Sequence, residues 1–160
     1  MKILFLDVDG VLNSQAFFSA RNKRTSPSPR NDIDSDALRR LCETIKRVGC
    51  LVVVSSSWRT GEPHRSAVAD ALAEHGVAVH GYTGTESYRR GLIVRGVEVQ
   101  AWLDENTDGA DYVIVDDDSD FLPHQMNRFV HTCQSVGLTD EKCAEIEDRF
   151  RNQEAERRKA

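Results

Sequence analysis

Two aspartates one residue apart, Asp7 and Asp9, stand directly behind an apolar run that begins almost at the start of the chain. Ser55 closes a second apolar run, LVVV, and the acidic pair Asp116 and Asp117 closes a third, YVIV. A single aspartate or serine in such a place is most often a turn former or a helix cap. In a parallel sheet, however, groups that close several strands meet at the edge where such sheets bind ligands.

Carboxylates gathered at one edge repel one another, by about 4 kcal/mol per pair at ~4 Å with an effective dielectric constant of about 20. Protonation could relieve this repulsion, but only if the pKa values rose by several units from about 3.9. A divalent cation is the simpler answer, and an all-oxygen site without nearby His or Cys suits Mg²⁺ better than zinc or copper. We therefore expect a Mg²⁺ cofactor among these carboxylates.

The same residues have the parts of a phosphoryl-transfer site. A metal would use one oxygen of Asp7 and leave the other free to attack an electrophile. Asp9 could lend its backbone carbonyl to the metal while its side chain acts as general acid and base, and Gly10 would let the chain turn sharply there. Phosphoryl transfer also needs donors for the remaining charge, and Ser55 and an arginine could supply them.

Short apolar runs and helical patterns alternate along the chain, which predicts the elements that would position these residues. Runs rich in Val, Ile and Leu predict strands at 3–6, 51–54, 77–79 and 112–115, with a weaker fifth at 129–132. Helical periodicity predicts helices between the cap Asp34 or Ser35 and the stop Gly49, and at 63–75, 97–103 and 140 to about 151. The alternation predicts an α/β fold, a Rossmann-like three-layer α/β/α sandwich with a mostly parallel sheet.

Length and composition predict one domain, residues 1–160, and exclude several functional classes. A formal net charge of -5 argues against binding to nucleic acid by bulk charge. The first apolar run is far shorter than the ~20 residues of a membrane span, so we expect no membrane partner and a cytoplasmic location. The cysteines show neither C-x-x-C nor zinc-ligand spacing and are expected to be buried free thiols: Cys42, Cys50, Cys133 and Cys143.

The segment DVDGV, 7–11, resembles the first motif, D-x-D-G-[TV], of the haloacid dehalogenase (HAD) superfamily of phosphatases. VVVS resembles the second motif of that superfamily, and VIVDD the fourth. The resemblance implies that Asp7 is a nucleophile that forms an aspartyl-phosphate and that Asp9 is the acid and base. It also implies the remaining roles: Ser55 and Ser56 bind phosphate, and Asp116 and Asp117 hold Mg²⁺ together with Asp7 and Asp9.

The third motif of the superfamily needs a basic residue near the start of the helix before the acidic strand. We expect Arg95 in this role because Gly96 follows and a helix is predicted to begin there, with Arg90 or Arg89 as substitutes. Asp118 and Asp120 are expected to support the site, cap a loop or face solvent.

The segment SSSWRTG, 55–61, is similar to a small branch of the superfamily found in bacterial and phage RNA-repair proteins. In this segment Trp58 could simply pack under the loop. Arg59 could contact substrate phosphate or could be solvated.

The intervals between the motifs are too short for an inserted cap domain, so the resemblance implies a minimal cap and an open site. The basic loop or flap at 14–33 carries Arg21, Lys23, Arg24 and Arg30, while 152–160 forms a charged tail. An open site with local positive charge favours a phosphorylated substrate such as a nucleic-acid end with a 3′-phosphate or a nucleotide. Two alternatives are a phospho-accepting signalling domain and a non-catalytic binding module of a repair complex.

Overall fold

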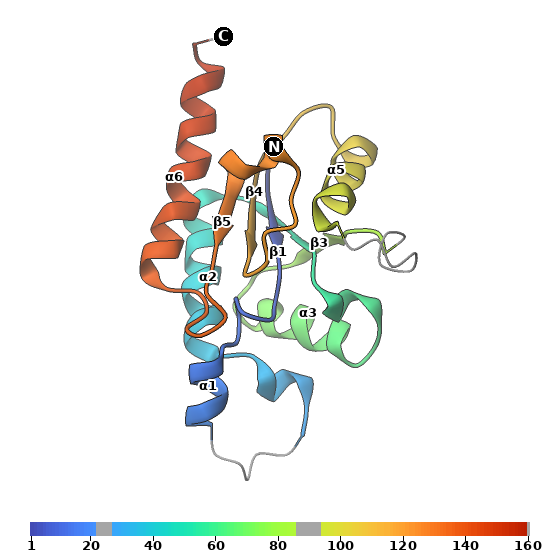
Figure 1. Cartoon of the computed structure of the whole chain (residues 1–160), viewed down its shortest axis with the longest axis vertical. Coiled ribbons are helices and arrows are strands. Elements are labelled where there is room, and N and C mark those ends of the chain that lie inside the picture. The colour runs from blue at the N-terminus through green and yellow to red at the C-terminus, as the bar shows by residue number, and fades with distance from the viewer. Residues whose placement is uncertain (22–26, 86–93, 160) are drawn as a thin grey trace.

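The computed structural model describes residues 1–21, 27–85 and 94–159. Within these residues a five-stranded sheet has the order β3-β2-β1-β4-β5, and every pair of neighbours is parallel. Helices flank the sheet on both sides (Figure 1), which confirms the predicted Rossmann-like α/β fold. The strands are β1 Lys2–Leu6, β2 Leu51–Val54, β3 Val79–Tyr82, β4 Asp111–Asp116 and β5 Phe129–His131.

The helices follow the strands in alternation, and the first long helix shows both predicted end signals. The Asp34 side chain accepts a hydrogen bond from the backbone N–H of Asp36, and Gly49 ends the helix in the left-handed region at φ 69°. The α-helices are α1 Gln15–Ala20, α2 Ser35–Val48, α3 His64–Glu74, α5 Arg95–Asn106 and α6 Asp140–Arg157; the 3₁₀ helices are η1 Pro29–Asp32, η2 Ser57–Thr60 and η3 Pro123–Arg128.

The two faces of the sheet bury separate apolar clusters. Leu4 and Leu6 of β1 point toward the face covered by α2, α3 and α6, while Ile3 and Phe5 point toward α5. All four side chains are fully buried, which explains why β1 reads as a continuous apolar run instead of an alternating one. The burial of each such side chain stabilises the folded protein by about 1.5–3 kcal/mol. β1 is therefore a rigid support for the residues that follow it.

Strand order places the predicted site residues at one edge. β1 lies between β2 and β4, because the chain adds β2 and β3 on one side of β1 and then crosses back to add β4 and β5 on the other (Figure 1). This is a topological switch point, where open α/β sheets bind ligands beyond the carboxyl ends of the strands. Asp7, Ser55 and Asp116 stand at the carboxyl ends of β1, β2 and β4.

Of the strand predicted at 77–79, only Val79 lies in a strand, so the prediction was wrong at two of its three positions. Gly76 adopts φ 71°, and Val77 donates its N–H to the Leu72 carbonyl at 3.0 Å, which closes helix α3. Val77 is therefore apolar because it packs beneath the end of α3. The real strand, β3 Val79–Tyr82, contains His80 and is partly exposed along its length, so it lacks the continuous apolar run of a central strand.

The last helix continues past its predicted end near residue 151, into the charged segment expected to be a tail. Gln153 explains the extension, because its buried side-chain amide donates to the Tyr112 carbonyl at 3.0 Å and accepts from the Tyr112 N–H at 3.1 Å. Lys2 also pairs with Glu154 at 2.6 Å. No helix in the described residues combines the length and the apolar character needed to cross a bilayer.

Two smaller expectations also need correction. The interval at 14–33 is not a plain loop, because it contains α1 and η1, and the Ser14 hydroxyl caps α1 by accepting from the Phe17 N–H at 3.1 Å. Cys133 is exposed, whereas Cys42, Cys50 and Cys143 are buried as expected. All of these cysteines are free thiols.

Candidate active site

Asp7 lies immediately beyond β1 and is 4% exposed. Its backbone N–H donates to the Val115 carbonyl at 3.0 Å, so the hydrogen bonding between β1 and β4 continues one residue past β1 and fixes the position of the carboxylate. Arg95 Nη1 donates to Asp7 Oδ1 at 3.0 Å. Burial raises the pKa of Asp7 to about 6, against the opposing effects of the Arg95 charge and a hydrogen bond from the Ser56 side chain.

Asp116 is the last residue of β4 and is 1% exposed. Its Oδ1 accepts from the Asp118 N–H at 2.9 Å, but its Oδ2 is buried without a hydrogen-bond partner. Burial, together with the nearby negative charge of Asp7, raises the pKa of Asp116 to about 8. Asp117 is half-buried, and burial raises its pKa as well. These groups are costly to hold as charged carboxylates without a cation.

Carboxylate oxygens of Asp7, Asp116 and Asp117 all lie within 4.8 Å of one another. A buried acceptor without a partner, beside two further carboxylates, is the environment that a hard divalent cation would stabilise, and all-oxygen donors match Mg²⁺. Gly10 makes this convergence possible. It adopts φ 68°, and a Cβ atom there would lie 2.3 Å from Asp117 Cγ.

Asp9 is exposed, unlike Asp7, and its carboxylate is held at both oxygens. Asn13 Nδ2 donates to Oδ1 at 2.9 Å, and Trp58 Nε1 donates to Oδ2 at 3.0 Å. Asn13 Oδ1 in turn accepts from the Gly10 N–H at 3.0 Å. Trp58 packs under the loop as expected, at 7% exposure, but it also orients the predicted acid and base.

Ser55 and Ser56 follow β2 and are both buried. The Ser55 N–H donates to the Leu6 carbonyl at 2.8 Å, and the Ser55 hydroxyl accepts from the Thr83 hydroxyl at 3.4 Å. The Ser56 hydroxyl contacts Asp7 and accepts from the Trp58 N–H at 3.3 Å. Ser56 therefore supports the predicted nucleophile, while Ser55 lies next to it at the carboxyl edge of the sheet.

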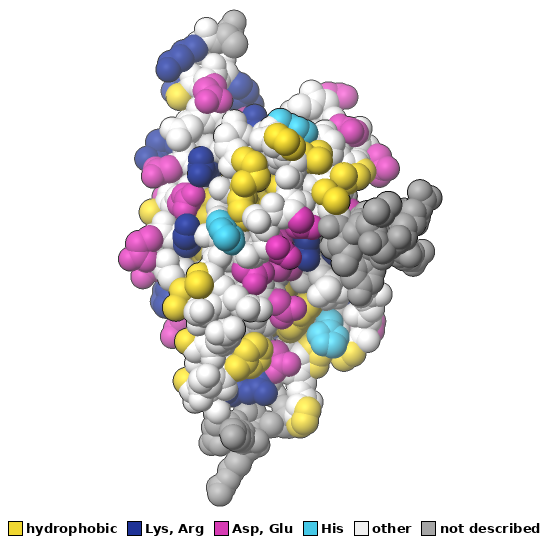
Figure 2. All heavy atoms as spheres, in the orientation of Figure 1, with side chains coloured by type: hydrophobic (Ala, Val, Ile, Leu, Met, Phe, Trp, Pro, Cys, Tyr) yellow, Lys and Arg dark blue, Asp and Glu magenta, His cyan; other side chains and the backbone are white. Residues whose placement is uncertain are grey.

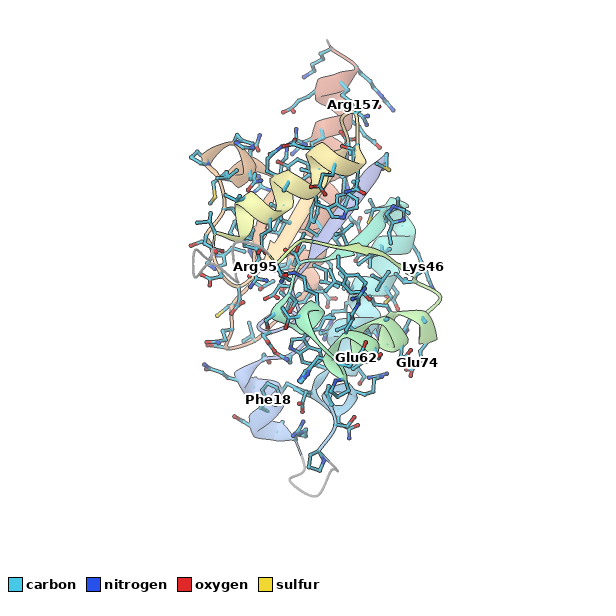
Figure 3. All side chains as sticks on the ribbon, turned by 90° about the vertical axis from the view of Figure 1, so that its right-hand side faces the viewer. Phe18, Lys46, Glu62, Glu74, Arg95 and Arg157 are labelled. Atoms are coloured by element: carbon cyan, nitrogen blue, oxygen red, sulfur yellow. The ribbon has the colours of Figure 1, made fainter. Side chains whose placement is uncertain are left out.

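Arg95 is the first residue of α5, and Figure 3 shows it near the middle of the molecule, where that helix begins. Its guanidinium bonds to Asp7 and to the Ser55 carbonyl, and Nη1 lies 3.5 Å from Asp116 Oδ2. Asp120 caps the helix by accepting from the Arg95 N–H at 2.9 Å. The alternatives Arg89 and Arg90 lie outside the described residues.

Arg59 is buried and bonds to its own chain in this structure. Its guanidinium donates to the carbonyls of Ser56, Thr83 at 3.1 Å and Gly84 at 2.9 Å, and it forms a buried ion pair with Glu98. Arg59 thus joins η2, the end of β3 and α5 around the site. A direct contact with substrate phosphate stays a prediction, and this geometry gives it no support.

The basic interval at 14–33 is partly neutralised by acidic residues. Arg21 pairs with Asp32, and Arg30 pairs with Glu74 of α3. Lys23 and Arg24 lie outside the described residues. Figure 2 shows acidic side chains gathered near the centre of the face that it draws.

Sequence reasoning missed three residues that shape the site, namely Asn13, Thr83 and Glu98. Asn13 carries a weak signal, because an asparagine shortly after a turn glycine often bonds to the turn backbone. Thr83 and Glu98 carry none, since their partners Ser55 and Arg59 are distant in the chain. Asp118 is exposed, as one of its expected roles required.

The comparison with known proteins agrees with the motifs at the carboxyl edge. A family model described as the HAD domain in Swiss Army Knife RNA repair proteins matches residues 3–143, a range that contains every site residue described above. No curated protein and no solved structure matches the chain. The family match spans most of the chain and confirms the resemblance inferred from its motifs. The chain therefore belongs to the family of HAD domains found in Swiss Army Knife RNA repair proteins.

Proposed function

We propose that this protein is a Mg²⁺-dependent phosphomonoesterase that acts through an aspartyl-phosphate on nucleic-acid ends bearing a 3′-phosphate or on nucleotides. The observation that carries the proposal is the convergence of Asp7, Asp116 and Asp117 oxygens within 4.8 Å, with the Arg95 guanidinium bonded to Asp7. This arrangement supports the proposal, because phosphoryl transfer requires a nucleophile, a cation and a fixed positive charge close together.

In the first step an Asp7 carboxylate oxygen attacks phosphorus, and the bond from phosphorus to the leaving oxygen breaks. Asp9 donates its proton to that oxygen, so the alcohol leaves neutral. Ser55 and Arg95 would donate hydrogen bonds to the phosphoryl oxygens, and Ser56 orients Asp7. A Mg²⁺ ion held by the acidic residues would neutralise charge on the transferring group.

In the second step Asp9, now a carboxylate, takes a proton from water, and the oxygen of that water attacks the phosphorus of the aspartyl-phosphate. The bond from phosphorus to Asp7 breaks, and inorganic phosphate leaves. The solvent exposures of the two aspartates fit their two proposed roles, because Asp9 is open to water whereas Asp7 is 4% exposed. A buried nucleophile and an exposed acid and base separate the two roles.

The test is turnover of an aryl phosphate with Mg²⁺ by the wild type and Asp7→Asn. Loss of the nucleophile is expected to reduce kcat by on the order of 10³-fold or more. Asp70→Asn is the matched control, because Asp70 is an exposed acid on α3 and its removal should leave kcat unchanged. Undiminished turnover by Asp7→Asn would contradict the proposed nucleophile.

The substrate class needs a panel measured with Mg²⁺. It comprises oligonucleotides with a 3′-phosphate, oligonucleotides with a 5′-phosphate, free nucleotides and sugar phosphates. We expect the highest kcat/KM for a 3′-phosphate on a nucleic-acid end or a nucleotide. Failure to hydrolyse any member, together with tight binding of RNA, would replace the enzyme with a non-catalytic binding module.

A further inference from the structure

An open groove lies beside the candidate active site, on the side of α3. Its volume is about 380 Å³, within the roughly 300–1,000 Å³ typical of small-molecule sites. Asp9 lines the groove together with the segment that contains η2 and leads into α3. Figure 3 shows Glu62 in that segment. The residues that line the groove include Asp9, Ser57, Trp58, Thr60, Glu62 and His64.

The wall of this groove is held by the chain around it. The buried Arg59 guanidinium ties η2 to the segment after β3 and to α5, as described above. The Thr60 hydroxyl donates to the Ser57 carbonyl at 2.8 Å, and the Trp58 N–H donates to the Ser56 hydroxyl. A wall fixed in this way loses little conformational entropy when a ligand binds.

Asp9 belongs both to the groove and to the proposed reaction. A general acid must lie within about 2.6–3.2 Å of the atom that it protonates, so the leaving oxygen of the substrate must come to the Asp9 carboxylate. The Trp58 indole fixes that carboxylate from the groove side at 3.0 Å. The alcohol part of the substrate, which continues from the leaving oxygen, therefore extends into the groove.

The side chains of the groove indicate what kind of alcohol fits. The exposed ring of His64 packs edge-on against Trp58, with centroids 5.0 Å apart and planes at 81°. An exposed ring offers a surface on which a base can stack. Glu62 is exposed, and although its Oε2 accepts from the Ser66 N–H at 3.1 Å, its carboxylate keeps lone pairs that can accept hydrogen bonds from ribose hydroxyls, as carboxylates do in nucleotide sites. The Ser57 hydroxyl adds a polar contact.

We propose that this groove binds the nucleoside part of a phosphorylated nucleoside, so that it forms the leaving-group subsite of the enzyme. The inference rests on the proposed phosphatase function and adds the source of substrate selectivity. The Glu62 carboxylate disfavours an alcohol that carries a further anionic group inside the groove. The subsite therefore selects a neutral nucleoside.

The test compares kcat/KM for adenosine 3′-monophosphate with kcat/KM for methyl phosphate, whose leaving group is too small to reach the groove. His64→Ala is expected to lower the ratio of the two values about tenfold, mainly through KM for the nucleotide. Glu62→Gln is expected to lower the ratio about threefold. His124→Ala is the control, because His124 is exposed on η3, bonded to Gln100 and outside the groove.

Calorimetric binding of adenosine 3′-monophosphate to the Asp7→Asn variant, with and without His64→Ala, separates this inference from the phosphatase proposal. Weaker nucleotide binding with His64→Ala would support the subsite even if no ester is hydrolysed. A ratio and an affinity unchanged in both His64→Ala and Glu62→Gln would overturn the subsite, whether or not the protein is a phosphatase. Thermal melting of each variant checks that the fold is retained.

Discussion

At the scale of single residues, the acidic groups at the carboxyl edge lower the free energy of unfolding of the metal-free protein once they are ionised. Asp116 has a raised pKa of about 8 and Asp7 one of about 6, both above the unfolded value of 3.8. The folded state therefore binds these protons more tightly than the unfolded state does. Stability from these groups is fully present below pH 3.8 and is lost as the pH rises through about 6 and about 8.

Asp116→Asn is accordingly expected to stabilise the metal-free protein. The amide removes a buried charge whose Oδ2 accepts no hydrogen bond, so at pH 8 with EDTA the free energy of unfolding should rise by about 1 kcal/mol, or about 3 °C in Tm. The gain should shrink at pH 5, and added Mg²⁺ should no longer raise Tm. Differential scanning fluorimetry checks this, with the exposed Asp118→Asn as control. A lower Tm for Asp116→Asn at pH 8 would contradict the electrostatic account.

Gly10 is a residue-scale requirement of the proposed cation site, and Gly49 provides a matched control. Both have nearly the same left-handed backbone, φ 68° and φ 69°, but only at Gly10 would a Cβ atom meet Asp117. Gly10→Ala and Gly49→Ala should each cost about 1 kcal/mol of stability from backbone strain. Only Gly10→Ala should also weaken Mg²⁺ binding, by at least about tenfold, because Asp117 must move. Calorimetric titration measures the Mg²⁺ affinity of each variant, and equal affinities would contradict this prediction.

At the scale of elements, the site depends on two strands and on the buried ion pair that joins the segments around them. β1 and β4 hold Asp7 and Asp116 in fixed register, with Leu6 opposite Val115. Arg59 and Glu98 then connect η2 to α5, and the side chains of this pair are 4% and 7% exposed. An arginine at such depth needs its counter-charge, so the pair determines how the segment next to the groove meets the helix that carries Arg95.

Removing Glu98 is therefore expected to be costly. Glu98→Ala leaves a buried guanidinium without its carboxylate and should lower the free energy of unfolding by about 3–5 kcal/mol. The double variant Arg59→Met/Glu98→Met should lose less than the sum of its single changes, because no charge is stranded. Urea denaturation of the wild type, the two single variants and the double variant gives the unfolding free energies for a double-mutant cycle. Additive losses would show that the two side chains are not coupled.

At the scale of the whole molecule, charge limits how a nucleic acid can bind. The net charge is -5, and Arg21 and Arg30 are paired with acidic residues. A polynucleotide would then gain few phosphate contacts beyond its end. Recognition of the terminal phosphate and nucleoside would carry the affinity.

The dependence of activity on salt tests this view. Log kcat/KM for a 3′-phosphorylated oligonucleotide should fall against log salt concentration with a slope of about -1 to -2, because each phosphate contact contributes about -0.7 for single strands. Adenosine 3′-monophosphate serves as the reference for a substrate with no further phosphates. A slope steeper than about -4 for the oligonucleotide would show an extended basic surface and contradict end recognition.

Reading the amino-acid sequence alone was enough to predict the parallel α/β class, the carboxyl-edge positions of Asp7, Ser55 and Asp116, and the start and stop of α2. These features follow from local patterns, because an apolar run, a cap or a turn glycine is recorded in neighbouring residues. It did not locate β3, which is an edge strand without a continuous apolar run, or the extension of α6, which depends on Gln153 bonding to Tyr112.

How the side chains of the site contact one another depends on the folded arrangement of distant segments. The hydrogen bond from Trp58 to Asp9 joins residues 49 positions apart, and the pair of Arg59 with Glu98 joins residues 39 apart. Neither contact has a local pattern, because each exists only once the sheet has brought distant segments together. The fold also gives carboxylates that look alike in the sequence different environments, because it buries Asp116 and leaves Asp9 open to solvent.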